Sequence, residues 1–286
     1  MRTILSIQSH VAFGHVGNRA AVFPLERLGF ETIAVNTVQF SNHTGYGSWT
    51  GTVFPPEHIA EIVRGVEARG ALARTDAVLS GYMGDALLGE AVLDAVAKVR
   101  AARPGAIYCC DPVMGDVGRG FFVRPGIPDF MRDRAVPAAD VVTPNQFELE
   151  FLTGAAVTDL DGALRAAAAA RALGPRIVLV TSLARAEAEP DTIEMLLDTA
   201  EGSWLVATPI VPLDPLPNGA GDAVAALFLA KLLETGEPPA ALSHAAAAIW
   251  AVFDETRRAG TRELALVAAQ DRLVRPDRAF PVARVR

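Results

Sequence analysis

The chain has 286 residues and a formal net charge of −7, with 51% hydrophobic and 21% charged residues. This composition is that of a globular protein and excludes a disordered or fibrous one. The sequence has no basic stripe and no run of about 18 apolar residues, so we expect neither a nucleic-acid partner nor a membrane span. The opening MRTILSIQSH is typical of a first strand, and the adjacent Cys109 and Cys110 predict core residues in a reducing, cytoplasmic location.

Several common catalytic devices are missing from the sequence. The only lysines, Lys98 and Lys231, do not follow a glycine-rich turn, and no G-x-x-x-x-G-K-[ST] motif occurs. A Walker-type NTPase is therefore excluded. The five histidines show no H-x-x-x-H or H-E-x-x-H spacing, which argues against a zinc enzyme.

Apolar runs of strand length alternate with helical periodicity along the whole chain. Strands are predicted at Thr3–Ile7, Thr32–Val38, Ala77–Ser80, Ala106–Cys110, Val141–Thr143, Ile177–Thr181, Met195–Leu197 and Trp204–Pro209. Helices are predicted at Val16–Leu28, Pro56–Arg69, Leu87–Ala101, Leu160–Leu173, Ala223–Leu233, Pro239–Phe253 and Glu263–Leu273. This alternation predicts an α/β fold with a mainly parallel sheet and helices on both faces. No linker interrupts it, so we expect a single domain over residues 1–286.

Polar residues lie where several predicted strands end. In open α/β sheets, ligands bind outside the carboxyl ends of the strands. Four such ends carry Ser9-His10, Asp111-Pro112, Thr143-Pro144-Asn145 and Thr181. Residues 218–222 precede a predicted helix near the C-terminus. We expect these residues and the four strand ends to converge on one edge of the sheet.

The segment Asn218–Asp222 is the strongest local signal. Gly219, Ala220 and Gly221 can expose consecutive backbone N–H groups at a helix start, where an anion is favoured. Asp222 in the first turn can accept a proton from a hydroxyl that attacks a phosphoryl group. The alternative interpretation, equally weighted on this segment alone, is that Asp222 simply caps the helix.

Two further segments offer carboxylates. Asn145 and Glu148 have the spacing of a capping box, which is the favoured interpretation for these residues alone. The functional alternative is that they hold Mg²⁺ through water molecules. Asp111 ends a buried strand and should face a cleft or a cation, whereas Asp116 is as readily a turn residue. The glycine-bearing loop Gly115–Gly120 is a candidate lid.

Longer strings in the sequence resemble the pyridoxal kinases of the ribokinase-like superfamily. They are SIQSHVAFGHVGNRAAVFPLERLGFE, VNTVQFSNHTGYGSWTG, DPVMGD, TPNQFELEFLTG and NGAGDA. The resemblance covers nearly the whole chain, and the QFSNHTGY string with SIQSH is its most specific part. It implies a three-layer α/β/α fold, phosphorylation of the 5′-hydroxyl of pyridoxal by ATP with Mg²⁺ and often K⁺, and a homodimer.

The resemblance also implies roles for individual residues. Asp222 matches the base that activates the 5′-hydroxyl, and residues 219–221 match the anion hole for the transferring phosphoryl group. The substrate ring is expected to meet Ser9, Phe40, His43, Thr44, Gly45 and Tyr82. Residues matching the surroundings of the ATP phosphates and their cations are Asp111, Thr143, Glu148 and Thr181, and Asp111 joins Asn145 and Glu148 as an expected metal ligand. The segment Thr208, Pro209, Ile210 and Val211 matches a stretch that flanks the adenine.

Three departures from the family pattern stand out. The turn reads GAGD where many members have GTGD, and Thr181 stands where some bacterial relatives have lysine. The lid carries Arg119, which either compensates near ATP or is solvated, and we favour the solvated interpretation.

Two rival functions stay open. One is a hydroxymethylpyrimidine kinase, which shares the fold and the chemistry, and the other is a pyridoxal-binding sensor without turnover. The QFSNHTGY loop disfavours the first, and the retention of Asp222, Asp111 and Glu148 disfavours the second.

Overall fold

A single ten-stranded sheet forms the centre of the protein in the computed structural model, which describes residues 2–286. Its strands are β1 (Thr3–Val11), β2 (Glu31–Phe40), β3 (Gly51–Val53), β4 (Thr75–Ser80), β5 (Ile107–Cys110), β8 (Val141–Val142), β9 (Ile177–Leu183), β10 (Thr192–Thr199), β11 (Gly202–Pro209) and β12 (Val282–Arg284). Six of them are parallel, in the order β9-β8-β5-β4-β1-β2. The antiparallel strands β3 and β10–β12 extend the two edges, so the predicted mainly parallel sheet is confirmed.

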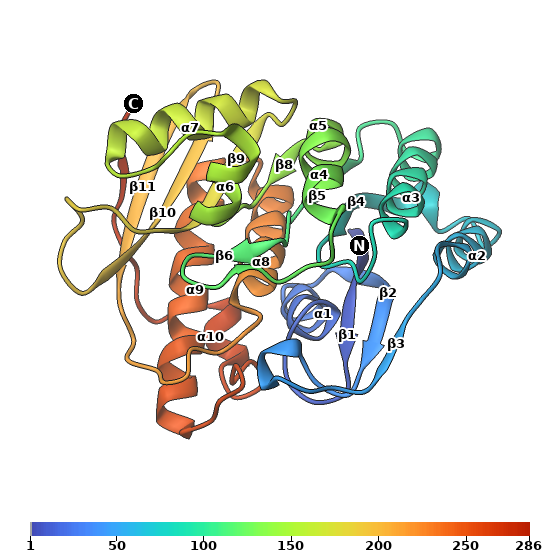
Figure 1. The fold of residues 1–286 in the computed structure, drawn as a ribbon, viewed down its shortest axis with the longest axis horizontal. Coiled ribbons are helices and arrows are strands. Elements are labelled where there is room, and N and C mark those ends of the chain that lie inside the picture. Colours follow the sequence, from blue (N-terminus) through green and yellow to red (C-terminus); the bar gives the residue numbers. More distant parts are fainter. Residues whose placement is uncertain (1) are drawn as a thin grey trace.

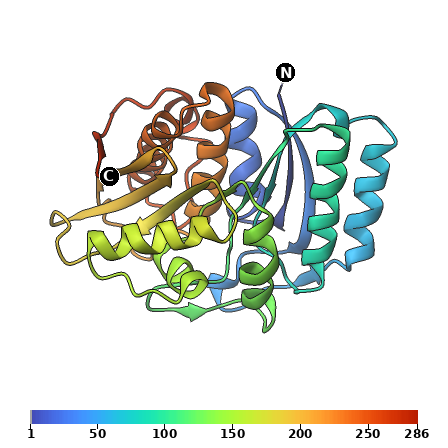
Figure 2. The ribbon, with the colours of Figure 1, turned by 90° about the horizontal axis from the view of Figure 1, so that it is seen from above.

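Helices cover both faces of this sheet (Figures 1 and 2). They are α1 (Asn18–Arg27), α2 (Pro56–Glu67), α3 (Leu88–Ala102), α4 (Ile127–Phe130), α5 (Val136–Ala138), α6 (Gln146–Thr153), α7 (Leu160–Ala172), α8 (Ala220–Thr235), α9 (Pro238–Ala259) and α10 (Gln270–Val274). Short 3₁₀ turns at 44–46 and 72–74 and a π-helical turn at 131–135 join them, and strands β6 (Gly115–Asp116) and β7 (Gly120–Phe121) form a separate hairpin. Within residues 2–286, no helix is long and apolar enough to cross a membrane.

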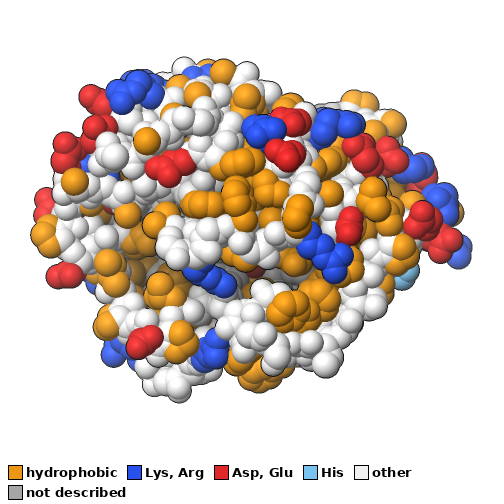
Figure 3. Space-filling model, in the orientation of Figure 1, with side chains coloured by type: hydrophobic (Ala, Val, Ile, Leu, Met, Phe, Trp, Pro, Cys, Tyr) orange, Lys and Arg blue, Asp and Glu red, His pale blue; other side chains and the backbone are white. Residues whose placement is uncertain are grey.

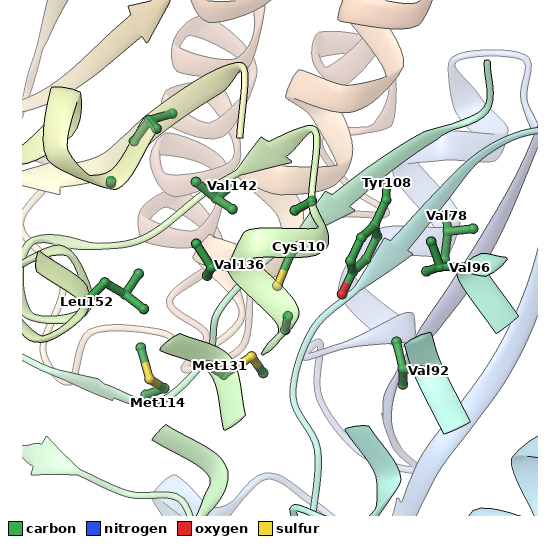
Figure 4. Packing of buried hydrophobic residues seen from close by; sticks show 14 of the residues in the cluster. Val78, Val92, Val96, Tyr108, Cys110, Met114, Met131, Val136, Val142 and Leu152 are labelled. Atoms are coloured by element: carbon green, nitrogen blue, oxygen red, sulfur yellow. The ribbon is translucent and has the colours of Figure 1, made fainter. Parts of the chain in front are cut away.

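The core consists of two hydrophobic layers, one on each side of the sheet. Successive strand residues point to opposite faces, so Ile4 packs with α1, α8, α9 and α10, whereas Leu5 packs with α2, α3 and α4–α7. In β5, Cys109 joins the first layer, and Tyr108 and Cys110 join the second (Figure 4). Both cysteines are free and fully buried, as predicted.

Helix α8 is the most deeply buried of the helices that the structure describes. Nine of its residues, from Ala223 to Leu232, are buried, because α1 and α9 flank the helix and its side chains share a core cluster with residues of the sheet. An all-round apolar sequence is typical of a helix in that position. Its burial fixes the direction in which its N-terminus, at Ala220, points.

The predicted helix Glu263–Leu273 is wrong over most of its length. Residues 261–265 have no regular secondary structure, residues 266–269 form a turn, and only Gln270–Val274 is helical. Leu264 and Leu266 are both fully buried at a spacing of two, which a helix cannot satisfy on one face. The sequence also did not predict the short strands β3, β6, β7 and β12, whose two or three residues carry little periodic signal.

Two predicted strands continue further than expected. Ser9 and His10 lie inside β1, and Thr181 lies inside β9, rather than after their strands. The reason is pairing with longer neighbours, since His10 still pairs with Gln39 of β2. These residues nevertheless lie within the last three residues of their strands, close to the carboxyl ends.

Phe228 tests the contribution of the α8 core to stability. Its ring is fully buried in the helix-covered layer. We expect Phe228→Ala to lower the free energy of unfolding by about 3–5 kcal/mol, because it leaves a cavity in a packed core. Urea denaturation measures the change, and Leu173→Ala at the exposed end of α7 is the control, with an expected effect within about 0.5 kcal/mol. A loss below about 1 kcal/mol for Phe228→Ala would contradict this packing.

Candidate active site

The carboxyl ends of the parallel strands form one edge of the sheet, and the predicted site residues gather there. Because β10 and β11 run antiparallel to each other, the end of β11 at Pro209 pairs with Thr192 at the start of β10, on the same edge as the end of β9. The edge therefore runs from β2 across to β11. The N-terminus of α8 approaches this edge, since the nearest atom to a Cβ built on Gly221 is Asp111 Oδ2, 4.0 Å away.

The glycine-rich loop at 219–221 has the geometry of an anion site. Gly219 is the N-cap of α8 in a left-handed conformation (φ 91°), and a Cβ there would lie 1.8 Å from the carbonyl oxygen of His15. Only glycine fits this close approach. The first backbone hydrogen bond of α8 runs from Ala223 N–H to Gly219 O, so the N–H groups of residues 220–222 lie ahead of the helical ladder. These N–H groups and the helix dipole favour an anion at this position.

Asp222 is the third residue of α8 and does not cap the helix. The N-cap is Gly219, and no side chain makes a capping hydrogen bond there, so the capping interpretation is wrong. The residue as a whole is partly accessible, but its carboxyl group is buried. This burial raises the pKa of Asp222 to about 6, although the hydrogen bond from the backbone N–H of Gly17 lowers it. A carboxylate with a pKa in this range is suited to accept a proton near neutral pH.

Asp111 lies directly after β5, buried and facing the same loop. Thr143 Oγ1 donates to Asp111 Oδ1 at 3.0 Å, which brings the ends of β5 and β8 together. Burial raises the pKa of Asp111 well above its ordinary value, and the charges of Asp222 and Glu148 raise it further. The predicted convergence of Asp111, Thr143 and Asp222 is thus seen in the structure.

Asn145 and Glu148 form a complete capping box at the start of α6. Asn145 Oδ1 accepts from Glu148 N–H and Glu148 Oε2 accepts from Asn145 N–H, both at 2.9 Å. Glu148 Oε1 also accepts from the N–H of Met114 at 2.8 Å, and Asn145 Nδ2 donates to Gly115 O at 2.8 Å. The capping interpretation is confirmed, and the box additionally fixes the base of the β6–β7 hairpin.

Three carboxylates thus share a small, poorly hydrated region. Burial raises the pKa of Glu148 to about 8, although the backbone N–H groups of Asn145, Met114 and Gly115 lower it. Asp111 feels the charges of both Glu148 and Asp222. In the described part of the chain, no three His, Cys, Asp or Glu side chains are arranged as a closed metal site. A cation here would need ligands beyond these side chains, such as water or phosphate oxygens.

Aromatic and small residues line the β1–β2 side of the edge. Phe40 and Tyr82 pack in one cluster with Val11, Val16, Val38 and Val53, and Thr37 Oγ1 donates to Tyr82 O at 2.8 Å. A Cβ on Gly17 would lie 2.3 Å from Ser9 Oγ. Since Gly17 also neighbours Asp222, Ser9 lies on the Asp222 side of this cluster. The structure therefore brings Ser9, Phe40 and Tyr82 to the edge.

The loop 41–50 carries the other predicted ring contacts. His43 is buried, and Thr44 and Gly45 begin a 3₁₀ turn. A Cβ on Gly45 would lie 2.8 Å from Asn218 Nδ2, so this loop touches the residue that precedes the anion loop. Arg262 Nη2 donates to Gly45 O at 2.7 Å from the far end of the chain.

The β6–β7 hairpin corresponds to the predicted lid at Gly115–Gly120. The face seen in Figure 3 carries this hairpin, with hydrophobic side chains gathered near the middle above a hollow. Val117 and Phe121 of the hairpin are exposed. Arg119 is exposed too, but its Nη1 donates to Asn218 Oδ1 at 3.4 Å and its guanidinium lies 5.2 Å from the Phe122 ring centre. Arg119 is therefore exposed to solvent, as the favoured interpretation expects, and its side chain also reaches the segment before the anion loop.

The remaining predicted contacts lie on the β9–β11 side. Thr181 N–H donates to Pro144 O at 3.0 Å, which places Thr181 beside Thr143. Thr208 and Pro209 end β11, Ile210 N–H donates to Asp191 O at 2.8 Å, and Val211 follows. A hollow of about 340 Å³ lies just beyond, lined by residues of 212–215 and of 256–262 at the end of α9.

Three residues of this edge were not singled out in the sequence. Gly17 belongs to the GHVGN string, which holds a signal for it. Arg262 and Glu263 do not, because Arg262 meets Gly45 across 217 residues, and Glu263 meets His43 across 220. Local periodicity carries no information about such distant contacts.

Comparison with known proteins agrees with this geometry. A family model described as phosphomethylpyrimidine kinase matches residues 34–266. The chain is 62% identical over 283 residues to pyridoxal kinase PdxY of Rubrobacter xylanophilus, covering 99% of this chain and 97% of that protein. It is 58% identical over 288 residues to pyridoxal kinase PdxY of Deinococcus radiodurans, with 99% and 97% covered. A solved pyridoxal kinase from Leishmania donovani, in complex with ADP and pyridoxine, matches with a TM-score of 0.92 at 32% identity over 99% of each chain.

The three-layer fold and the glycine-rich helix start beside a carboxylate define a small-molecule kinase of the ribokinase-like superfamily. Within this superfamily, the chain belongs to the pyridoxal kinase family.

Asp222→Asn tests the electrostatic cost of the site. Folding raises the pKa of Asp222 from 3.8 to about 6, so its ionised form destabilises the folded state above pH 6. This destabilisation decreases as the pH falls toward 4, because the Asp222 carboxyl group is then protonated in the folded state and partly protonated in the unfolded state. We expect D222N to exceed the wild type by about 2–3 kcal/mol in unfolding free energy at pH 8 and by under about 1 kcal/mol at pH 4, measured in urea.

Asp198→Asn is the matched control at the opposite edge of the sheet. Asp198 is fully buried, but Arg171 Nε and Ser203 Oγ donate to it at 2.9 Å and 2.6 Å, so its charge is compensated. D198N should therefore lower stability at pH 8. A D222N protein that is also less stable than the wild type at pH 8 would contradict our account of Asp222.

Proposed function

We propose that the protein transfers the γ-phosphoryl group of ATP to the 5′-hydroxymethyl group of pyridoxal, giving pyridoxal 5′-phosphate. The observation that carries the proposal is the position of Asp222 in the first turn of α8, directly after the glycine-rich loop and ahead of the first backbone hydrogen bond of the helix. Phosphoryl transfer needs positioning and charge stabilisation more than covalent chemistry, and this arrangement supplies both. The relatives named pyridoxal kinase support pyridoxal as the acceptor.

In this proposal Asp222 is the general base. Its carboxylate accepts the proton of the 5′-hydroxyl as the oxygen attacks the phosphorus. The N–H groups of Gly219, Ala220 and Gly221 stabilise the negative charge on the transferring group. The missing threonine of the GAGD turn removes a hydroxyl but leaves these backbone donors in place.

The carboxylates near the anion loop suit a hydrated divalent cation. Both Glu148 oxygens accept backbone N–H groups, so Glu148 would hold Mg²⁺ through water, as would Asn145, whereas Asp111 Oδ2 faces Gly221. The raised carboxylate pKa values fit a site that gains from a cation. Mg²⁺ would neutralise the charge on the ATP phosphates there, with K⁺ as an assisting ion.

The proposed nucleotide contacts extend toward β11. Thr143 and Thr181 border the phosphates beside Asp111, and residues 208–211 flank the adenine next to the hollow at 212–215. Arg119, which reaches Asn218, offers a positive charge on the lid side, whereas Thr181, which stands where some relatives have lysine, lies in β9.

The ring of the substrate is proposed to lie between the β1–β2 cluster and loop 41–50. Phe40 and Tyr82 supply its apolar walls. Ser9, His43, Thr44 and Gly45 are proposed to supply polar groups at its rim. Gly45 lies beside Asn218 and His43, and Ser9 lies beside Gly17, which contacts Asp222.

We further propose that the chain works as one domain, since the sheet continues from β3 to β12. A cytoplasmic homodimer is the proposed state of the enzyme. The exposed Phe13 and Trp49 side chains support a protein contact surface.

ADP release with Mg-ATP tests the substrate. Pyridoxal, pyridoxine, pyridoxamine and hydroxymethylpyrimidine are offered in parallel at equal concentrations. We expect kcat/KM for pyridoxal to exceed that for hydroxymethylpyrimidine by at least about tenfold, because pocket contacts of one or two hydrogen bonds discriminate by this amount.

A preference for hydroxymethylpyrimidine would favour the second candidate function, a hydroxymethylpyrimidine kinase. The matched family model, described as phosphomethylpyrimidine kinase, is the observation that supports this candidate. Pyridoxal binding without turnover of any ring would indicate a sensor.

Asp222→Asn also tests the mechanism. Loss of the base should lower kcat by about 10²–10⁴-fold, with little change in the KM for ATP. In the wild type, kcat/KM should fall about tenfold per pH unit below about pH 6, because Asp222 becomes protonated there. D222N should lack this acid limb. Unchanged turnover in D222N would rule out Asp222 as the base.

A further inference from the structure

Glu263 lies in the segment after α9, far in sequence from the motifs of the site. Its side chain is buried, with 8% of the residue exposed, and its carboxylate points toward two loops from the N-terminal part of the chain. The proposed mechanism gives it no role.

The Glu263 carboxylate bonds to three groups on those loops. Oε1 accepts from Tyr46 OH at 2.7 Å and lies 3.0 Å from His43 Nε2, and Oε2 accepts from the backbone N–H of His15 at 3.1 Å. Oε2 would be 2.3 Å from a Cβ on Gly14, so only glycine permits this approach. The carboxylate thus fixes loop 41–50 against the loop that leads to Gly17.

These contacts determine the tautomer of His43. Burial raises the pKa of Glu263, but the hydrogen bonds from Tyr46 and His43 outweigh it and leave the pKa below its ordinary value. An ionised carboxylate accepts hydrogen bonds and donates none, so His43 Nε2 must carry the proton. In the neutral ring, Nδ1 is then a hydrogen-bond acceptor.

His43 Nδ1 is buried and has no hydrogen-bond partner among residues 2–286. The residue is 6% exposed, and Nδ1 lies 3.0 Å from the Cβ position of Gly45, close to Asn218. A buried acceptor in this state gains from a donor group. The acceptor lies on the side of loop 41–50 that touches the segment before the anion loop.

We propose that Glu263 is a positioning residue for the substrate pocket, which holds His43 as its Nε2–H tautomer and so presents Nδ1 to a hydrogen-bond donor of the bound heteroaromatic ring. This inference rests on the proposed function for the identity of the ring. The donor is a ring N–H or a hydroxyl, since these are the donors such a ring carries.

Glu263→Gln reverses the proposed polarity without changing the packing volume. The backbone N–H of His15 can only donate, so the glutamine carbonyl turns toward it and the NH₂ group faces Tyr46 and His43. His43 Nε2 then accepts, and the proton moves to Nδ1. The variant therefore offers the ligand a donor in place of an acceptor.

Ring-nitrogen NMR of histidine-labelled, ligand-free protein reads the tautomer directly, with the His43 signal assigned by its loss in His43→Gln. We expect the Nε2–H form in the wild type and the Nδ1–H form in E263Q. In steady-state assays, the KM for pyridoxal should rise about tenfold in E263Q and that for Mg-ATP should change less than about twofold.

Asp198→Asn is the control, because it converts another buried carboxylate to an amide at the opposite edge of the sheet. It should leave both the His43 tautomer and the ratio of the two KM values unchanged. The same His43 tautomer in the wild type and E263Q, or an equal rise of both KM values in E263Q, would overturn the inference. Absence of pyridoxal turnover in the wild type would instead refute the proposed function, because the NMR measurement needs no ligand.

Discussion

Burial of three carboxylates, one after β5 and one in the first turn of each of α6 and α8, is the constraint on which the rest of the site depends. Each of these carboxyl groups, Asp111, Glu148 and Asp222, has a raised pKa, because burial raises the pKa by more than the nearby hydrogen-bond donors lower it. Only part of the charge is compensated, by Thr143 on Asp111 and by backbone N–H groups on Glu148. A folded protein tolerates such an arrangement because its helix-covered core supplies stability elsewhere. The uncompensated remainder is what makes the edge receptive to a proton or a cation.

Close backbone approach is the second requirement of this edge, and it explains the glycines there. Gly219 touches the His15 carbonyl, and Gly17 touches Ser9, at distances that a side chain would forbid. The loop before α1 is therefore packed between β1 and the start of α8. These contacts hold the proposed substrate side and the proposed phosphate side of the edge at a fixed separation, as transfer between two bound molecules requires.

The sequence was sufficient for the sheet, the two helix layers and the motif residues. Strands such as β4 and β9 contain apolar runs, and the rule that ligands bind outside the carboxyl ends of parallel strands predicts that Asp111 and Thr143 lie near residues 219–222. It was insufficient where a side chain serves a distant partner. Asn145 and Glu148 have a local signature and were interpreted correctly, but Asp222 was given equal odds of capping because its N-cap geometry depends on Gly219 packing against His15.

Segment 261–269 is a second place where contacts with distant residues, which local sequence does not reveal, decide the structure. Leucines and alanines there favour a helix by propensity, yet Glu263 is turned inward by three partners from residues 15–46, and Leu264 and Leu266 are both buried. Tertiary contacts override local preference when they satisfy a buried charge that a helix would leave exposed or unpaired. Through Glu263, the segment 261–269 contacts loops 12–17 and 41–50, so residues near the two ends of the sequence lie against each other. The proposed pocket for the ring therefore includes contacts from the C-terminal segment, since Glu263 bonds to both loop 12–17 and loop 41–50.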